Sequence, residues 1–587
     1  MGRAISEILA AQLSGISGDQ VIAPAVLRGA SVQMGVRPVR APGISSERDA
    51  ALASGANRLA SCEYSVEGGR LRVSAQIEDA AGMKMVQRAH AEGPATSVIP
   101  VTGALATQFS PQARPYVTSS QDAVHGYADG IEAPDQAAAS EAFARAVAAD
   151  PNFGPAYLGW AAAEMGRRDR AAAEHVLEMA KARGNAIPAY DRARLALATA
   201  DLKGDSVARM QALASLAKAG PADPDVYKGL AEAALQGRRY RDAVNAYRQA
   251  LALTPDDATL LNSLGYAEAY LGDLDRSLDA LRNYERLQPK QANPIDSQAD
   301  VNFYAGHYAE AEKLYLAAHA KDPNFLGGAE LLKAAQARLA TGDVVGADQF
   351  FQQYVGPLET RHDPAVGLRK AQWKYLTGHR REAVAMLTAD PAQSPQSETQ
   401  LAIWNLSLGD RPAAERIAKT MASKPGMPPV LLAMASFLSQ SPVPAAEWEA
   451  RARVFGQSPL RDQFIAYGLV FGREVREALP FLRRSWEQMN PNNEEGMPVL
   501  LAWSMMEAGQ WEGITSLVGP TPIPQATGPG LLTSLFFPRL FYLRGRNYER
   551  LGKHDQALEN YRLFLKLAGN DAEIWGDEQR AREAIGK

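Results

Sequence analysis

Small and large apolar residues recur at fixed spacing between residues 224 and 323. Three successive units end at Pro255, Pro289 and Pro323, a step of 34 residues each time. Before each proline come a small residue, a large apolar residue four places later, and a small or aromatic residue three places after that. The small positions are Ala243, Ser277 and Ala311, the large ones are Tyr247, Leu281 and Tyr315, and the third ones are Ala250, Tyr284 and Ala318.

This spacing predicts a helical hairpin in each unit. Gly272 and Gly306 fall at one aligned position, where glycine lets the chain turn with positive φ, and the first unit has Arg238 there. The small residue lets the two helices approach closely, and the large residue four places later fills the gap between them. Proline then ends the second helix. Because one hairpin cannot bury its apolar face alone, each unit requires neighbours.

The pattern resembles the tetratricopeptide repeat. Leu264 and Gly265 supply its leucine-glycine pair, and Tyr227 stands at its first aromatic position. The last repeat has Phe541, Gly545, Tyr548, Gly552, Ala557 and Tyr561 in register, and weaker copies occur at 141–151, 156–180, 337–354, 374–387, 404–418 and 469–486. The resemblance implies a mainly α fold, a right-handed superhelical solenoid of helical hairpins from about residue 120 to 570. Residues 424–461 and the proline- and glycine-rich stretch 518–530 interrupt it.

The first 112 residues follow a different pattern. Residues 2–13 space their apolar side chains for one helix face, 20–24 form a short apolar stretch, and 45–56 predict a helix capped by Ser45 or Ser46 and ended by Gly55. Alternating residues in 58–67, 70–79 and 84–93 predict a three-stranded antiparallel meander, and 96–109 predicts a final helix. We therefore expect a small α/β domain at 1–112, helical repeats at 113–517, a loop at 518–530, and a last repeat with its tail at 531–587.

The N-terminal pattern is similar to the TolB-like or FlgO-like domain that precedes such repeats in bacterial regulatory proteins. The similarity rests on ISEILAAQLSG, QVIAP and the hairpin YSVEGGRLRVSAQIEDAAGMKMV. Members usually have an extra strand before the first helix. That strand is missing here, so the chain is a piece of a longer protein or its sheet is completed otherwise. The resemblance implies a link to a kinase, cyclase or DNA-binding module.

Charge and composition narrow the classes of function. The chain has 62 basic and 66 acidic residues, and this balance gives no broad basic field for nucleic acid. No apolar run approaches the roughly 20 residues that span a bilayer. We expect a soluble chain, either cytoplasmic or the extracytoplasmic part of a protein anchored upstream. The single cysteine, Cys62, excludes an intramolecular disulfide and a cysteine-rich metal site, and we interpret it as an ordinary buried thiol.

The sequence contains no motif that indicates catalysis. Phosphate-binding and dinucleotide-binding loops, zinc-protease and nucleophile-elbow motifs and kinase motifs are all missing. The eight histidines lack metal-ligand spacing, and Trp160, Trp373, Trp404 and Trp503 fit the core of first helices. We therefore predict a chain that is not an enzyme, with no catalytic residue, metal site or cofactor.

The inner wall formed by the first helices is the predicted place for function, and its ligand is expected to be a protein or peptide. The repeat register puts these residues on that wall: Lys228, Glu232, Asn262, Tyr266, Tyr270, Asp296, Asp300 and Tyr304. Tyrosines beside amides and carboxylates suit contact with a peptide main chain. The family's carboxylate clamp uses Lys, Asn and Arg, and only Lys228 and Asn262 match it, in different repeats.

We therefore predict a scaffold or adaptor that forms the sensory or interaction region of a bacterial signalling protein. Three alternatives stay open. The wall could be polar without a dedicated ligand, the solenoid could host a peptide- or glycan-modifying enzyme, or the chain could be an architectural oligomer joined through its final repeat.

Overall fold

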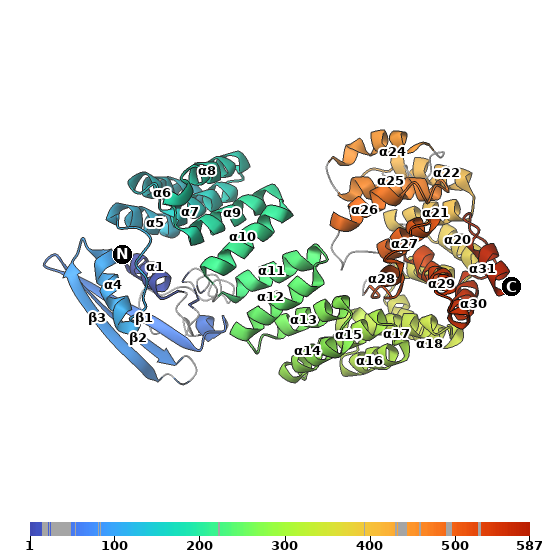
Figure 1. Ribbon diagram of the computed structural model, residues 1–587, viewed down its shortest axis with the longest axis horizontal. Coiled ribbons are helices and arrows are strands. Elements are labelled where there is room, and N and C mark those ends of the chain that lie inside the picture. Colours follow the sequence, from blue (N-terminus) through green and yellow to red (C-terminus); the bar gives the residue numbers. More distant parts are fainter. Residues whose placement is uncertain are drawn as a thin grey trace. The chain divides into compact units, whose positions relative to one another are not determined.

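The computed structural model places most of the chain in helices, arranged as two compact units (Figure 1). It describes residues 1–587 apart from 15–20, 23, 25–26, 28–48, 53, 80–81, 83, 221–222, 392–393, 429–430, 433–442, 457–458, 489–495, 526–529 and 587. The first unit consists of residues 1–233 and 249–255, and the second of residues 234–248 and 256–587.

A three-stranded antiparallel sheet with two helices begins the first unit. Its elements are α1 (Gly2–Leu13), β1 (Arg58–Glu67), β2 (Arg70–Asp79), β3 (Met85–Pro94) and α4 (Val98–Phe109), and the strand order is β1-β2-β3. Leu71, Val73 and Ala75 alternate with exposed residues along β2, because successive side chains of a strand point to opposite faces. They pack with residues of α1 and α4, including Ile8 and Leu105. The predicted meander and its flanking helices are confirmed.

Two parts of the N-terminal prediction have different outcomes. Val21 and Ile22 lie in no strand, so the strand expected at 20–24 is not formed over the residues described there. A short apolar run does not by itself distinguish a strand from other structure. Residues 49–52 are helical and Gly55 has a positive φ of 81°, as the second predicted helix requires. Ser45, Ser46 and the stretch 28–44 lie outside the described residues.

Helical hairpins make up the remainder of the first unit. They are formed by α5 (Gln121–Glu132), α6 (Gln136–Ala149), α7 (Gly154–Gly166), α8 (Arg170–Ala182), α9 (Ala189–Lys203), α10 (Ser206–Ala219) and α11 (Pro224–Gln236), with a short 3-10 turn at Gly184–Ala186. Asp135, Asp169 and Asp205 accept hydrogen bonds from backbone N–H groups at the starts of their helices, which satisfies donors that the helix itself cannot.

The second unit continues the hairpins. Following α12 (Tyr240–Leu253), its α-helices are α13 (Ala258–Leu271), α14 (Leu274–Leu287), α15 (Asn293–Tyr304), α16 (Tyr308–Lys321), α17 (Ala329–Ala340), α18 (Val344–Thr360), α19 (Val366–Leu376), α20 (Arg380–Ala389), α21 (Pro395–Ser407), α22 (Arg411–Ala422), α24 (Ala445–Arg451), α25 (Pro459–Phe471), α26 (Leu479–Gln488), α27 (Met497–Glu507), α28 (Ile514–Val518), α29 (Thr533–Arg550), α30 (His554–Ala568) and α31 (Asp577–Ile585). Short 3-10 turns lie at Phe325–Gly328 and Ala452–Phe455.

The small and large positions of the repeat lie in the core, as the spacing predicts. Ala243, Ser277 and Ala311 have no exposed surface, and Leu281 is equally buried. A Cβ atom at Gly265 would lie 2.6 Å from Leu281 Cδ2, closer than carbon atoms pack. The glycine of the first helix therefore receives the large residue of the second.

The turn between paired helices uses a left-handed residue. Gly272 and Gly306 have φ angles of 92° and 84°, and Arg238 has φ 54° at the aligned position of the preceding unit. A non-glycine residue in this region costs roughly 1–2 kcal/mol. The Arg238 guanidinium lies 3.3 Å from the centre of the Trp486 ring and donates from Nε to the Trp486 carbonyl oxygen at 3.2 Å.

The final repeat packs against earlier first helices, a contact that the repeat pattern does not predict. Gln400 Nε2 donates to the Leu531 carbonyl oxygen at 2.8 Å, and Trp404 Nε1 donates to Ser534 Oγ at 3.0 Å. Tyr375 donates its hydroxyl to Glu573 at 2.9 Å. One face of α19 and α21 is therefore covered by the C-terminal part of the same chain.

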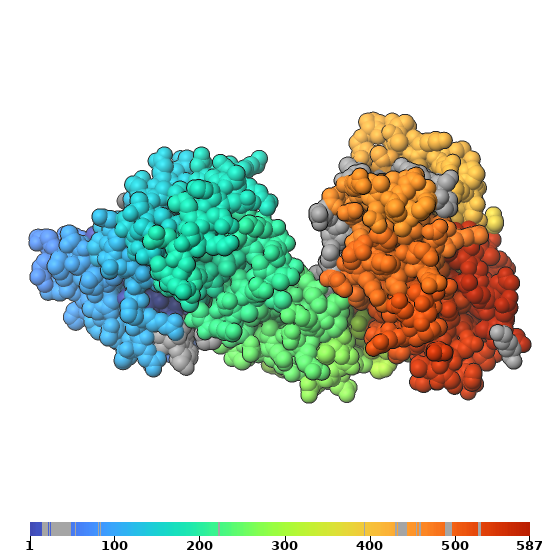
Figure 2. Space-filling view, turned by 45° about the horizontal axis from the view of Figure 1, so that its top comes forward, coloured from blue at the N-terminus to red at the C-terminus, as the bar shows by residue number. Residues whose placement is uncertain are grey.

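The C-terminal region also contacts the end of α25. The ring of Trp575 lies 5.5 Å from that of Phe471, and its Nε1 donates to the Val470 carbonyl oxygen at 2.8 Å. In the space-filling view, the orange residues of α25 and α26 adjoin the red residues of the C-terminal helices (Figure 2). Segments about 100 residues apart in the sequence therefore share one packed region of the second unit.

Replacing Gly265 by Ala tests the close approach inside a hairpin. We expect the added methyl group to push against Leu281 and to reduce the local stability of α13 and α14 by about 1–3 kcal/mol. Hydrogen–deuterium exchange of peptides from these helices measures the change.

The matched control is Gly103→Ala in α4, where the nearest atom to a new Cβ is the flexible end of Gln12 at 3.2 Å. Alanine favours a helix interior over glycine by up to about 1 kcal/mol, so exchange in α4 should stay equal or become slower. Equal protection of α13 in the wild-type chain and in Gly265→Ala would contradict the packing argument.

Candidate functional site

The eight predicted wall residues fall into two groups. Lys228 and Glu232 are half-buried on α11 in the first unit. The other six lie in the second unit, on α13 (Asn262, Tyr266, Tyr270) and α15 (Asp296, Asp300, Tyr304). The structure brings these six close together, and whether any of the eight binds a partner stays a prediction.

Four partly exposed tyrosines form a continuous aromatic surface in the second unit, which we call the tyrosine face. The ring of Tyr270 lies 6.5 Å from that of Tyr266, 5.2 Å from that of Tyr304 in an edge-to-face arrangement, and 5.6 Å from that of Tyr240. Tyr240 begins α12 and was not among the predicted residues, because that prediction considered only first helices. The surface thus combines the ends of two first helices with the start of a second helix.

A buried polar cluster lies behind this surface. Tyr266 and Tyr315 both donate their hydroxyl groups to Asp300, at 2.8 and 2.7 Å. Lys333 of α17 donates to Asp296 at 2.8 Å and to Asp300 at 3.1 Å. The side chains of Lys333 and Asp296 are each only 4% exposed. Asp296 and Asp300 are therefore engaged inside the protein, while Tyr270 and Tyr304 remain partly accessible.

The cluster has an excess of negative charge. Burial raises the pKa of Asp296 to about 7, and the neighbouring Asp300 carboxylate raises it further against the opposing effect of Lys333. Burial also raises the pKa of Glu330 to about 7. Neither carboxylate oxygen of Glu330 has a hydrogen-bond partner, and its closest cationic candidate is His319 Nδ1 at 3.9 Å.

The buried cluster fixes the position of one tyrosine of the exposed face. Because Tyr266 is bonded to Asp300, and Asp300 is bonded to Lys333 of the next hairpin, three successive repeats are joined by charge-assisted hydrogen bonds. Asn262 shows a different situation, since its Oδ1 atom is buried and has no hydrogen-bond partner.

Two other classes of site have no support among the described residues. His, Cys, Asp and Glu side chains there do not gather into a group of three or more that could hold a metal ion. No helix in the same part of the chain is long and apolar enough to cross a membrane. Cys62 is partly buried, and burial raises the pKa of its thiol to about 11.

Glu330→Gln tests the charge excess through pH. The folded-state pKa values of Asp296 and Glu330 are raised, so between about pH 4 and pH 7 the unfolded chain releases protons that the folded chain retains. The free energy of unfolding therefore falls as the pH rises through this window. Glutamine cannot ionise, so we expect Glu330→Gln to be more stable than the wild type by about 1–3 kcal/mol at pH 8, with a smaller difference at pH 5.

Thermal unfolding at the two pH values measures this difference. The control is Glu310→Gln on α16, where the glutamate is exposed and pairs with Lys313. A constant offset between Glu330→Gln and the wild type at pH 5 and pH 8 would show that Glu330 does not titrate in this window.

Comparisons with known proteins support the repeat architecture. A TPR repeat model matches residues 235–272, and a tetratricopeptide repeat model matches residues 538–571. No curated protein matches the chain.

Similar solved structures include MamA (18% identity, TM-score 0.27) and YrrB, described as a TPR protein with an unusual peptide-binding site (17%, 0.28). A tetratricopeptide repeat protein from Parabacteroides merdae is also similar (15%, 0.30). They cover 30%, 32% and 43% of this chain and 94%, 94% and 98% of their own. The two family matches, together with the helical hairpins at those positions, identify tetratricopeptide repeats in this chain at residues 235–272 and 538–571.

Proposed function

We propose that the chain is a non-enzymatic scaffold that binds an extended peptide segment of a partner protein on the tyrosine face. The observation that supports this most is the contiguity of the rings of Tyr240, Tyr266, Tyr270 and Tyr304, which come from three different helices and are all partly exposed. Tetratricopeptide repeats generally serve as protein-interaction scaffolds, which agrees with this use.

Tyrosine suits this task because it combines a large contact area with few rotatable bonds and a hydroxyl group that hydrogen-bonds a peptide backbone. The rings also restrict one another, and Tyr266 is held by Asp300. A surface that is already ordered loses little conformational entropy when a ligand binds, so more of the contact energy appears as affinity.

The first unit would have two further roles in this function. Lys228 and Glu232, half-buried on α11, would supply charged contacts to a partner protein. The N-terminal sheet domain would act as the docking or sensory module of a bacterial signalling protein, as its resemblance to the TolB-like domain implies. An enzyme on the solenoid and an architectural oligomer remain the alternatives to this function.

Changing the tyrosines tests the proposal. Peptides are selected from a displayed random library on the purified wild-type chain, and their affinities are measured by fluorescence anisotropy. We expect the double variant Tyr270→Ala/Tyr304→Ala to bind the selected peptides at least about tenfold more weakly, because central aromatic residues dominate such interfaces.

Val207→Ala and Val345→Ala are the controls, since both valines are highly exposed, at 60% and 74%, and lie outside the tyrosine face. Their affinities should equal that of the wild type. If no peptide is enriched, or if the enriched peptides bind the tyrosine variant as tightly as the wild type, the tyrosine face is not the binding surface. Light scattering of the same samples tests the architectural alternative, which requires an oligomer.

A further inference from the structure

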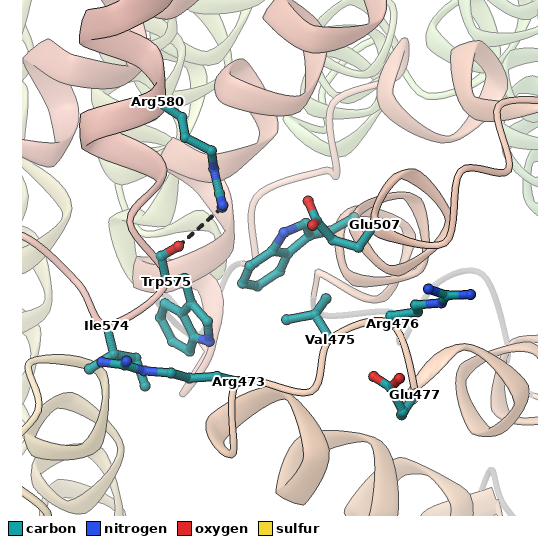
Figure 3. A pocket seen from close by; sticks show the side chains of 9 residues that line it. Arg473, Val475, Arg476, Glu477, Glu507, Ile574, Trp575 and Arg580 are labelled. Atoms are coloured by element: carbon teal, nitrogen blue, oxygen red, sulfur yellow. Dashed lines mark hydrogen bonds between the residues drawn. The ribbon is translucent and has the colours of Figure 1, made fainter.

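A pocket of about 400 Å³ lies in the second unit, lined by four separate segments (Figure 3). These are the turn after α25 that contains Arg473 and Arg476, the α27 residues Trp503 and Glu507, the stretch at Trp575, and Arg580 of α31. No residue of the tyrosine face lines it. The volume lies near the lower end of the range of roughly 300–1,000 Å³ found for small-molecule sites.

Two tryptophans give the pocket an aromatic wall. The rings of Trp503 and Trp575 lie 5.5 Å apart in an edge-to-face arrangement. Arg539 supports both rings from the protein interior, with its guanidinium carbon 4.4 and 4.6 Å from their centres. Arg539 is itself bonded to Glu573 at 2.8 Å, and all these side chains are buried or nearly so. The aromatic wall is therefore held in place.

One hydrogen-bond donor in this wall is unused. Trp575 Nε1 is satisfied by the Val470 carbonyl oxygen. Trp503 is 1% exposed, and its Nε1 is buried without a hydrogen-bond partner among the described residues. An unsatisfied buried donor costs free energy in the empty protein, and a ligand acceptor in the pocket would recover that cost.

The pocket also carries unpaired positive charge. The side chains of Arg473 and Arg476 are exposed and form no hydrogen bond or ion pair with the described residues, whereas Arg580 is bonded to Asp577 at 2.6 Å and to the Trp575 carbonyl oxygen at 3.0 Å. Of the two carboxylates, Glu507 pairs with Arg546, and Glu477 is unpaired among the same residues. Two free cations against one free anion leave a net charge of about +1, which favours a monoanion.

Arg473 occupies its place in a strained conformation. Its φ angle of 69° lies in the left-handed region, where the corresponding turn after α27 has Gly509 with φ 74°. Glycine would adopt this conformation without cost. Figure 3 shows the Arg473 side chain extending below Ile574 and Trp575, on the side of the pocket opposite to Arg580.

We propose that this pocket binds a small carboxylate with a flat apolar body, such as an aryl carboxylate. The two carboxylate oxygens suit the planar donors of Arg473 or Arg476 and the indole N–H of Trp503, and the flat body suits the tryptophan rings. A phosphate dianion is less favourable, because Glu477 and Glu507 lie on the same wall. The chain thereby has a small-molecule site in addition to the proposed peptide-binding surface.

Direct titration of the purified full chain tests the ligand class. The probes are phenylacetate, its neutral analogue phenylacetamide, and inorganic phosphate, measured by calorimetry and by saturation-transfer NMR. We expect phenylacetate to bind, and the amide and phosphate to bind at least about tenfold more weakly. Lack of phenylacetate binding up to about 10 mM, or equal binding of the amide, would overturn the proposal. Tighter binding of phosphate, or of acidic peptides alone, would likewise reject a carboxylate small molecule as the ligand.

Variants test the position of the site. Arg473→Gly removes one cation and relieves the backbone, so the variant should fold, and we combine it with Arg476→Gln. Phenylacetate affinity should fall by at least about tenfold. Arg168→Gly is the matched control, since Arg168 is an exposed residue with φ 63° at an equivalent turn of the first unit, and it should leave affinity unchanged.

A further variant tests the unused donor. Trp503→Phe keeps an aromatic ring and removes the N–H group, so affinity should fall while circular dichroism still reports a folded chain. Unchanged affinity in the double arginine variant would overturn the proposal. Tyr270→Ala/Tyr304→Ala should bind phenylacetate as the wild type does, so failure of the proposed peptide-binding function and failure of this inference give different results.

Discussion

The close approach of two helices within each hairpin is the constraint on which the structure depends. It recurs where a first-helix glycine faces a large residue of the second helix: Gly265 faces Leu281, Gly545 faces Tyr561, and Gly130 faces Phe143. A Cβ atom added at any of these glycines would lie 2.6 Å from the nearest atom of the facing side chain. Only a residue without a side chain permits that distance. Once the pair is formed, its remaining apolar face requires the next hairpin, so the stability of each repeat depends on its neighbours.

Buried charges then join parts of the chain that apolar packing alone would not distinguish. Lys333 links Asp296 and Asp300 across neighbouring hairpins, and Arg539 links Glu573 and Asp577 in the C-terminal region. Desolvating such ions is expensive unless each has its partner, so an alternative packing that separated them would be strongly disfavoured. These clusters therefore favour one arrangement of hairpins whose apolar surfaces are otherwise much alike.

The repeat register could be predicted from the sequence because it repeats a local constraint. It located the core positions, and it placed a turn at Arg238 although no glycine stands there. It did not predict the packing of α29 against α19 and α21, because a repeat pattern describes only neighbouring hairpins. The burial of Asp300 was also missed, although a signal existed: Tyr266 lies 34 residues before it, and Lys333 lies 33 residues after it. Tyrosine, aspartate and lysine at one repeat step place complementary groups in successive helices.

The packing of the C-terminal repeat limits where a partner can bind in the second unit. Gln400, Trp404 and Tyr375 lie on first helices, and all three are hydrogen-bonded to residues beyond 530. First helices of this region thus use polar groups on the chain itself, whereas α13 and α15 present partly exposed tyrosines. A ligand on the tyrosine face would contact only a few rings, so its affinity must come from preorganisation rather than from area. The buried bonds of Asp300 supply that preorganisation, and this connects the charge cluster to the binding surface in front of it.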